Sequence, residues 1–110
     1  MIFSKKENIS IITQENATII ELVAKLTKRY DEFKNDNIIV NLFSVKEIQP
    51  NAINDFMLIS NQHKAKKHSF VIVSSIINID DAPEELSIIP TLQEAFDTIE
   101  MEEIERDLGF

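Results

Sequence analysis

The sequence of 110 residues contains a single glycine, Gly109, which is the second-last residue. Glycine allows positive φ angles and a close approach of the backbone to a ligand. Glycine-rich phosphate loops, the dinucleotide-binding fingerprint and the G-x-S-x-G nucleophile elbow all require it. These three kinds of site are therefore excluded from this sequence.

Composition excludes further kinds of site. The sequence has no Cys, so it holds no disulfide, no thiolate nucleophile and no cysteine-bound metal. Its formal net charge is −8 and its isoelectric point is about 4.7. Such a chain repels polyanions, and we expect no nucleic-acid partner because binding one would need a strongly segregated basic patch.

The sequence also lacks the signals that direct a chain to a membrane. No apolar run approaches the roughly 18 residues of a membrane span, and the N-terminal stretch MIFSKKENIS has no apolar segment of the signal-peptide kind. Hydrophobic residues make up 44% of the chain, which is enough to build a core. We therefore expect one cytoplasmic domain over residues 1–110, with no membrane partner and no cofactor.

Hydrophobic periodicity predicts five strands and three helices. Runs of apolar and β-branched residues favour strands, whereas apolar residues three and four apart favour helices. The strands are predicted at 1–6, 9–13, 38–43, 70–73 and 87–89, and the helices at 18–34, from 50 or 51 into the basic stretch 63–68, and at 91–108.

Capping residues mark the start of two of these helices. Thr18 is followed by Glu21 and Thr91 by Glu94, which is the spacing of a capping box. Asn16 is an alternative cap for the first helix.

The third helix is the most regular of the three. Gly109 follows it at the position of a left-handed C-cap, and Phe110 is expected to fold back onto the last turn. One face is predicted to be buried and carries Leu92, Ala95, Phe96, Ile99, Ile104 and Leu108.

The predicted order of elements is β-β-α-β-α-β-β-α. The strands at 38–43 and 70–73 are nearly continuous apolar runs, as in strands that are covered on both faces. Right-handed crossovers join such strands into one sheet. We expect an α/β fold with a mixed central β-sheet and with helices mainly on one face.

Several stretches resemble the STAS domain, the fold of anti-sigma factor antagonists. In that family an apolar strand with an Asp near its end leads into V-x-x-I-D-S-S-G-L and then a helix. IIVNLFSVKEIQPNAI at 38–53 is similar, with Val45 and Ile48 in the apolar frame. FVIV at 70–73 is similar to the next core strand, and SIIPTLQEAFDTIE at 87–100 to the closing strand and helix.

The resemblance aligns the family's switch residues with different residue types here. Gln49 falls on the family's Asp, Pro50 and Asn51 on its two serines, Ala52 on its glycine and Asn41 on the acidic position in the strand. In switching members a kinase phosphorylates the second serine. The resemblance therefore implies that the phosphoacceptor is absent, because Asn51 has no hydroxyl.

A small shift of this alignment does not restore a phosphoacceptor. The nearest serines are Ser44 on one side and Ser60 on the other, both well outside a slip of one or two residues. The corner then has two interpretations. It is either a protein-docking surface or simply the start of a helix, with Pro at its first position and Asn as its cap. The docking residues are predicted to be Gln49, Asn51, Ala52, Asn54 and Asp55.

The third helix has a strongly acidic surface, opposed by only one cation, Arg106. Carboxylates near a helix C-terminus act against the helix dipole. The acidic face is either kept for a basic partner surface or is a solvated face that keeps the chain soluble. Its residues are Glu94, Asp97, Glu100 and Glu103.

The remaining polar clusters favour structural roles. Two histidines five residues apart do not share a helix face, so they do not predict a metal site. Asp80 and Asp81 are better explained as caps of a turn at Pro83 than as a Mg²⁺ site. The basic stretch of His63, Lys64, Lys66, Lys67 and His68 is interpreted as compensation of a helix dipole, with weak phosphate or nucleotide binding as the alternative.

The sequence does not predict an enzyme. Ser74 and Ser75 lack a nearby base or glycine loop. The segment IEMEEIERDLGF resembles small bacterial STAS-like proteins, some of which are catalogued as ribonuclease Z. That enzyme is a zinc nuclease with an H-x-H-x-D-H cluster, which is absent from this sequence.

We therefore predict a non-catalytic protein–protein interaction module. The resemblance implies a role like that of an anti-sigma factor antagonist, with an anti-sigma-type regulator as partner. The alternative is an accessory subunit or chaperone of a partner enzyme such as ribonuclease Z.

Overall fold

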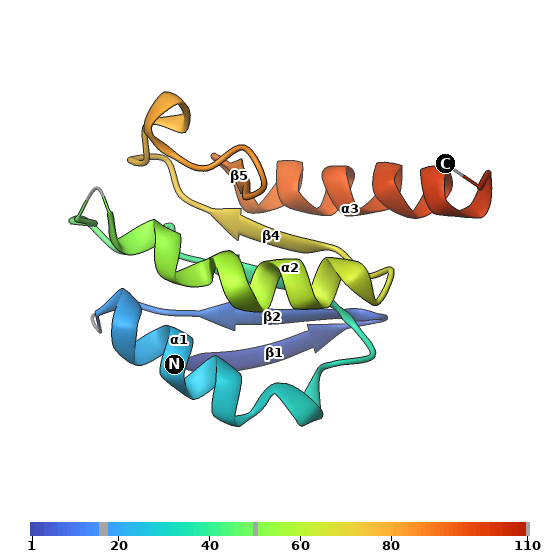
Figure 1. Ribbon diagram of the computed structural model, residues 1–110, viewed down its shortest axis with the longest axis horizontal. Coiled ribbons are helices and arrows are strands. Elements are labelled where there is room, and N and C mark those ends of the chain that lie inside the picture. Colours follow the sequence, from blue (N-terminus) through green and yellow to red (C-terminus); the bar gives the residue numbers. More distant parts are fainter. Residues whose placement is uncertain (16–17, 50, 110) are drawn as a thin grey trace.

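The computed structural model describes residues 1–15, 18–49 and 51–109. It contains a five-stranded sheet in the order β1-β2-β3-β4-β5 (Figure 1). The strands are β1 (Ile2–Lys6), β2 (Ile9–Thr13), β3 (Asn37–Asn41), β4 (Phe70–Val73) and β5 (Ser87–Ile89). The helices are α1 (Ile19–Lys28), α2 (Met57–Ala65) and α3 (Leu92–Asp107), with 3-10 turns η1 (Tyr30–Glu32), η2 (Ala52–Phe56) and η3 (Ile79–Asp81).

The sheet is mixed, as the order of elements predicts. β1 and β2 form an antiparallel hairpin, while β2, β3, β4 and β5 run parallel. β2 and β4 end at the left in Figure 1, and β3 and β5 run parallel to them, so we call this end of the sheet the carboxyl edge. The opposite end, where α2 turns into β4, is called the amino edge.

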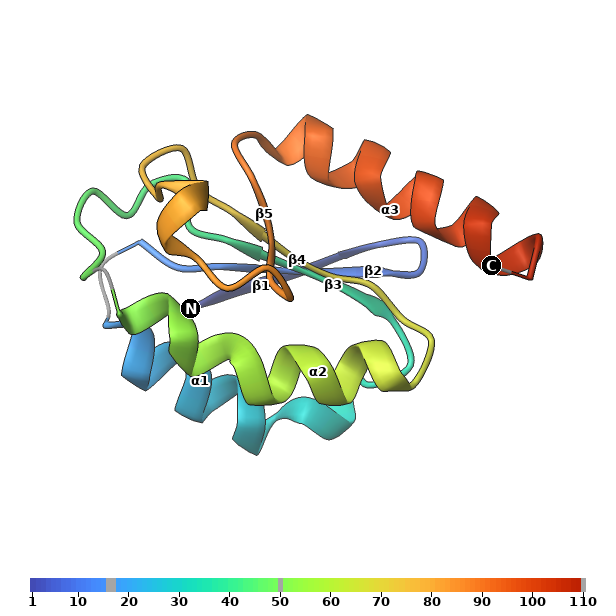
Figure 2. The same cartoon turned by 45° about the horizontal axis from the view of Figure 1, so that its top comes forward.

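Helices cover both faces of the sheet (Figure 2). α1 and α2 pack on one face and bury Ile38, Val40, Phe70 and Ile72. α3 packs on the other face, where Ala95 and Ile99 meet Ile39, Val71 and Val73. The prediction of helices mainly on one face holds for α1 and α2. α3 takes the opposite face because β3 and β4 carry apolar side chains on both sides, and both sides need cover.

The first helix starts as predicted and ends earlier. The Thr18 hydroxyl accepts a hydrogen bond of 3.2 Å from the backbone N–H of Glu21. The regular helix stops at Lys28 rather than near residue 34, and η1 follows it. The periodicity continued past Lys28 because Tyr30 and Phe33 still pack toward the core from the shorter turn. The alternative cap Asn16 lies outside the described residues.

The third helix also starts at its predicted cap, where Thr91 Oγ1 accepts a bond of 3.2 Å from the Glu94 N–H. Gly109 has φ +83°, and its N–H donates to the Arg106 carbonyl. This confirms the left-handed C-cap. Phe110 lies outside the described residues. The prediction that Ile104 and Leu108 are buried is wrong, since both are exposed.

Within the described residues, no helix combines the length and the apolar character that a membrane crossing requires.

Candidate functional site

The predicted corner lies at the carboxyl edge, where β3 ends. The Leu42 N–H donates to the Val73 carbonyl at 2.8 Å, so this residue still pairs with the neighbouring strand. The Asn41 side chain then accepts a bond of 3.1 Å from the Phe43 N–H, which turns the backbone out of the sheet. Leu42 and Val45 are buried and hold the loop, whereas Phe43 between them is exposed. The chain thus presents an aromatic ring at this edge.

The helix after this loop starts differently from the prediction. Asn51 has φ −91° and ψ −8°, and its side chain makes no capping bond with the described residues. The chain first forms η2, and α2 becomes regular only at Met57. Ile53 and Phe56 are three residues apart and both buried, which suits the three-residue repeat of a 3-10 turn. Pro50 lies outside the described residues.

The predicted docking residues share one exposed surface on η2 and the loop before it. Gln49, Asn51, Asn54 and Asp55 are exposed, and Ala52 is half-buried. Main-chain bonds fix them, because the Ala52 N–H donates to the Gln49 carbonyl at 2.9 Å and the Asn54 N–H to the Asn51 carbonyl at 3.2 Å. The structure therefore brings these five residues together.

The loop that follows β4 faces this corner. Its turn η3 is capped by Asn78, whose side-chain oxygen accepts a bond of 3.0 Å from the Asp80 N–H. Asp80 and Asp81 lie within η3 itself and are exposed. The turn at Pro83 is closed by the main chain, where the Leu86 N–H donates to the Pro83 carbonyl at 3.1 Å, so their predicted role as caps of this turn is not confirmed. In the described residues, no group of three His, Asp or Glu side chains is arranged to hold a metal ion.

A small pocket separates the two loops. Its cavity volume is 150 Å³. Ligand sites for small molecules usually have cavities of roughly 300–1,000 Å³, so this pocket is smaller than such sites and has room for a single amino-acid side chain. It is lined by Ile48, Gln49 and Ile53 on one side and by Ile76, Ile77, Asn78 and Asp81 on the other.

Sequence reasoning did not identify the exposed apolar residues at this edge of the sheet. Phe43 from the loop after β3, and Ile76 and Ile79 from the loop after β4, are large and exposed. Ile20 and Leu58 are exposed in the first turns of α1 and α2, which begin at the same edge in Figure 1. A group of exposed apolar side chains on one edge is typical of a protein-binding surface. In the sequence, Ile76 and Ile79 could have been recognised as large apolar residues that lie within a loop rather than within a strand or helix.

The hydroxyl groups near the corner are not arranged as a reactive site. Ser44 is exposed in the loop after β3. Ser60 is fully buried, and its hydroxyl finds no hydrogen-bond partner among the described residues. The Ser74 hydroxyl accepts a bond of 3.3 Å from the Ile76 N–H, which is a structural role in the turn.

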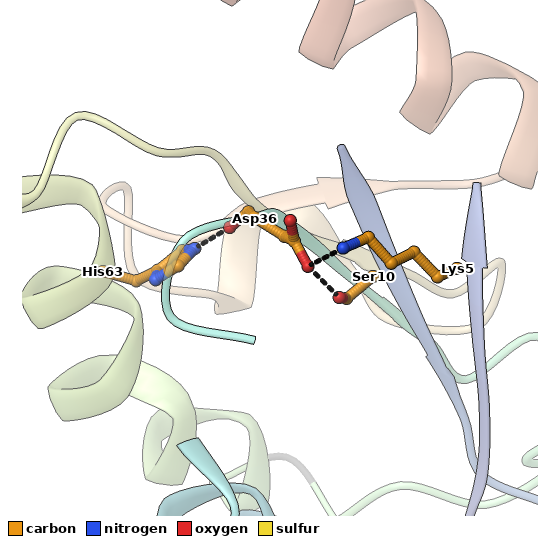
Figure 3. A network of polar contacts seen from close by, with 4 residues as sticks. All are labelled: Lys5, Ser10, Asp36 and His63. Atoms are coloured by element: carbon orange, nitrogen blue, oxygen red, sulfur yellow. Dashed lines mark hydrogen bonds and ion pairs between the residues drawn. The ribbon is translucent and has the colours of Figure 1, made fainter. Parts of the chain in front are cut away.

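A second polar cluster occupies the amino edge, and sequence reasoning missed it (Figure 3). Lys5 Nζ lies 3.2 Å from the Asp36 carboxylate, and the Ser10 hydroxyl donates to the same oxygen at 2.9 Å. His63 Nε2 donates to the Asp36 main-chain carbonyl at 2.7 Å, and its Nδ1 accepts from the Tyr30 hydroxyl at 2.6 Å. Both ring nitrogens of a neutral imidazole are thus satisfied.

His63 therefore does not compensate the dipole of α2, contrary to the prediction. Burial lowers the pKa of His63 from 6.5 to about 4, so it is neutral near pH 7. A sequence signal existed, because His63 follows the buried Phe56 and Ile59 at helical spacing. His68 also differs from expectation. α2 ends at Ala65 and Lys67 turns the chain with φ +69°, so the rings of His68 and His63 stack at 5.3 Å.

The lysines of the basic stretch are dispersed. Lys64 Nζ donates to the Glu85 carbonyl, and burial lowers its pKa. Lys66 Nζ lies 4.5 Å from the centre of the Tyr30 ring. The contacts of these two lysines do not support the alternative of a phosphate site.

The acidic face of α3 is also smaller than predicted. Glu94, Asp97 and Glu100 are exposed, as expected. Glu103 instead turns toward the amino edge, where it accepts hydrogen bonds from Asn8 at 2.9 Å and Asn37 at 2.5 Å. Its position on the helix matches that of the buried side, so it belongs to the α3–sheet contact.

The arrangement of the strands and helices is that of a STAS-like α/β domain, as the sequence predicts. No family model and no curated protein matches the sequence. Among solved structures, the chain is similar to a serine-to-glutamate variant of RsbS from Moorella thermoacetica, with a TM-score of 0.69 and 11% identity over 91% of this chain and 94% of that chain.

The chain is also similar to one from the molecular architecture of the stressosome, a signal integration and transduction hub. That match has a TM-score of 0.64 and 11% identity, and it covers 91% of this chain and 96% of the other. At this level of identity the likeness establishes the fold but not the function.

Proposed function

We propose that this chain is a non-catalytic protein–protein interaction module that resembles an anti-sigma factor antagonist and acts in the cytoplasm. The observation that carries the proposal is the exposed apolar group of Phe43, Ile76 and Ile79 beside the corner residues. Ile76 also lines the small pocket between the two loops, which has room for a single side chain of a partner. The likeness to RsbS and to a stressosome component supports a regulatory role for such a surface.

The proposed partner is an anti-sigma-type regulator that contacts Gln49, Asn51, Ala52, Asn54 and Asp55. Asn51 and Asp55 are exposed and flank the half-buried Ala52 on η2. Asn51 has no hydroxyl, so we infer that docking at this position is not switched by phosphorylation. The module would then bind its partner without the on–off control that a phosphorylated serine provides.

A site-specific photo-crosslinking residue at Ile76 tests the docking surface in cells. We expect it to capture an anti-sigma-type regulator, and the double substitution Asn51→Arg and Asp55→Arg should abolish that capture. Asn61→Arg with Gln62→Arg is the matched control, because both residues are exposed farther along α2. Capture that persists in the corner variant would show that the docking surface is wrong.

The alternative role, as an accessory subunit or chaperone of a partner enzyme such as ribonuclease Z, is tested by the same crosslink. No contact among the described residues favours it. Capture of that nuclease at Ile76, in place of a regulator, would establish it.

A further inference from the structure

The outward side of α3 carries an apolar stripe formed by Met101, Ile104 and Leu108, which we call the outer stripe. Their exposed fractions are 59%, 49% and 68%. Residues three, four and seven apart lie on the same side of a helix. The three side chains therefore form one continuous row of about 10 Å, from the 1.5 Å rise per residue.

The outer stripe lies opposite the side of α3 that packs on the sheet. That inner side is marked by Ala95 and Ile99, which are 0% and 1% exposed. At about 100° per residue, Ile104 and Leu108 lie roughly 140–180° around the helix from Ile99. α3 is thus apolar on two opposite sides, and a helix of this kind is typically covered on both.

The charges around the outer stripe are almost all negative. α3 carries seven carboxylates and one cation, Arg106. The Arg106 guanidinium turns inward and donates to Ser69 Oγ at 3.1 Å and to Asn37 Oδ1 at 3.3 Å. The described residues form three ion pairs, and all three lie within residues 5–36. None of them involves α3. The exposed carboxylates near the stripe are Glu94, Asp97, Glu100, Glu105 and Asp107.

We propose that the outer stripe binds a basic amphipathic helix of another protein. The apolar residues of the partner helix would cover Met101, Ile104 and Leu108, and its Lys and Arg side chains would lie beside the carboxylates. Apolar anchors at positions i, i+3 and i+7 are the usual pattern of helix-to-helix recognition. Complementary charge sets the choice of partner and its orientation.

A second copy of this chain does not fit the stripe. Two α3 helices packed through their outer stripes would bring their carboxylates together, and the only α3 cation is held by Ser69 and Asn37. Like charges that face one another at an interface are strongly unfavourable. The charge distribution thus selects a basic partner over self-association.

The outer stripe is separate from the corner at the carboxyl edge. α3 lies on the face opposite α1 and α2, and its last turns reach the amino edge (Figure 2). Binding at the stripe therefore does not depend on the proposed function of the corner, and substitutions at either surface can be tested separately.

The test measures binding of a fluorescent peptide to the full chain by anisotropy. The peptide contains only leucine and lysine, arranged as a helix with all leucines on one side. The variant Met101→Ser with Ile104→Ser should weaken binding about tenfold, which corresponds to about 1.4 kcal/mol. The matched control is Ile2→Ser, because Ile2 on β1 is 57% exposed, close to the 59% of Met101, and belongs to neither proposed surface; its affinity should be unchanged.

Three results would overturn the proposal. A scrambled peptide of the same composition that binds equally well would mean that charge alone attracts it. Equal affinity of the outer-stripe variant and the parent chain would place the binding elsewhere. A dimer in sedimentation experiments that the outer-stripe variant abolishes would make a second copy the occupant. Circular dichroism should show unchanged folding in both variants, since all three substituted residues are exposed.

Discussion

Two residues with side chains adopt the backbone conformation that usually requires glycine. Glu7, in the β1–β2 turn, has φ +54°, and Lys67, after α2, has φ +69°. The left-handed region costs a residue with a Cβ about 1–2 kcal/mol. The near absence of glycine therefore leaves a local strain at both of these turns.

We expect Lys67→Gly to raise the free energy of unfolding by about 0.5–1 kcal/mol, because glycine adopts this φ without strain. Urea denaturation measures the change. Lys67→Ala is the control, since it removes the same side chain and keeps the Cβ. If alanine stabilises the chain as much as glycine does, the backbone conformation is not the cause.

His63 makes stability depend on pH in the acidic range. Its pKa is lowered to about 4 in the folded chain by burial, assisted by the nearby His68 and Lys66 and opposed by the bond to the Asp36 carbonyl. The unfolded chain binds a proton near pH 6.5, so it holds more protons than the folded chain between pH 6.5 and 4. The contribution of His63 to the free energy of unfolding is thus complete above pH 6.5 and is lost as the pH falls toward 4.

Between pH 7 and 4.5 this loss should amount to roughly 2–3 kcal/mol. Denaturation curves across this range should show a flatter pH dependence for His63→Gln than for the parent chain. His68→Gln is the control that removes an imidazole while leaving the buried one. An unchanged slope in His63→Gln would assign the acid sensitivity to other groups.

The residue at position 51 gives a prediction about modification. Exposure of the chain to kinase extracts should leave residues 46–58 without phosphate in mass spectrometry, because this stretch contains no Ser, Thr or Tyr. Ser44 is the exposed serine closest to it and serves as the internal comparison. A phosphate on Ser44 would show that the loop after β3 can be phosphorylated. It would contradict the proposal that docking at the corner is not controlled by phosphorylation.

At the scale of elements, the sequence predicts what local chemistry decides. The strands at 70–73 and 87–89 and the caps Thr18, Thr91 and Gly109 were predicted correctly, because each depends on residues within one turn or one apolar run. Periodicity did not decide which apolar residues of α3 meet the sheet. Both sides of that helix are apolar, and only the packing on β3 and β4 separates Ile99 from Ile104.

The candidate site was predictable only in part, for a related reason. The position of residues 49–55 directly after a buried strand was enough to predict the corner. Phe43, Ile76 and Ile79 come from two loops, and only the parallel pairing of β3 with β4 brings those loops together. The amino-edge cluster likewise joins His63 to Asp36 and Tyr30, which are distant in sequence.

The start of α3 provides a prediction at this scale. Thr91→Ala removes the hydroxyl that caps the Glu94 N–H and should lower the free energy of unfolding by about 1 kcal/mol. Thr98→Ala is the matched control, because its hydroxyl donates only to the Glu94 carbonyl within the helix. Equal losses from the two variants in thermal or urea unfolding would contradict the role of the cap.

At the scale of the whole molecule, the Asn37 side chain joins the last turns of α3 to the sheet. Its side-chain oxygen accepts from the Ser69 N–H at 2.8 Å and from Arg106, and its amide donates to Glu103. Asn37 thus connects β3 with the segment before β4 and with the last turns of α3. Buried polar groups with several partners hold a fold in one arrangement.

Asn37→Ala should therefore lower the free energy of unfolding by roughly 2–3 kcal/mol, because it leaves the buried Ser69 N–H without its acceptor. Hydrogen exchange should also show faster opening of the last turns of α3. Asn61→Ala, at an exposed position on α2, is the control. A loss of stability without any change in the exchange of α3 would mean that Asn37 does not anchor this helix.

α3 runs from the carboxyl edge toward the amino edge, where the outer stripe ends (Figure 1). The molecule measures 38 Å along its longest axis. A rigid body of this size that holds one protein at each surface keeps both within a few nanometres. Each then meets the other at a local concentration on the order of millimolar, as for two sites joined by a short linker. The small chain would in this way raise the avidity of two weakly associating proteins without itself changing shape.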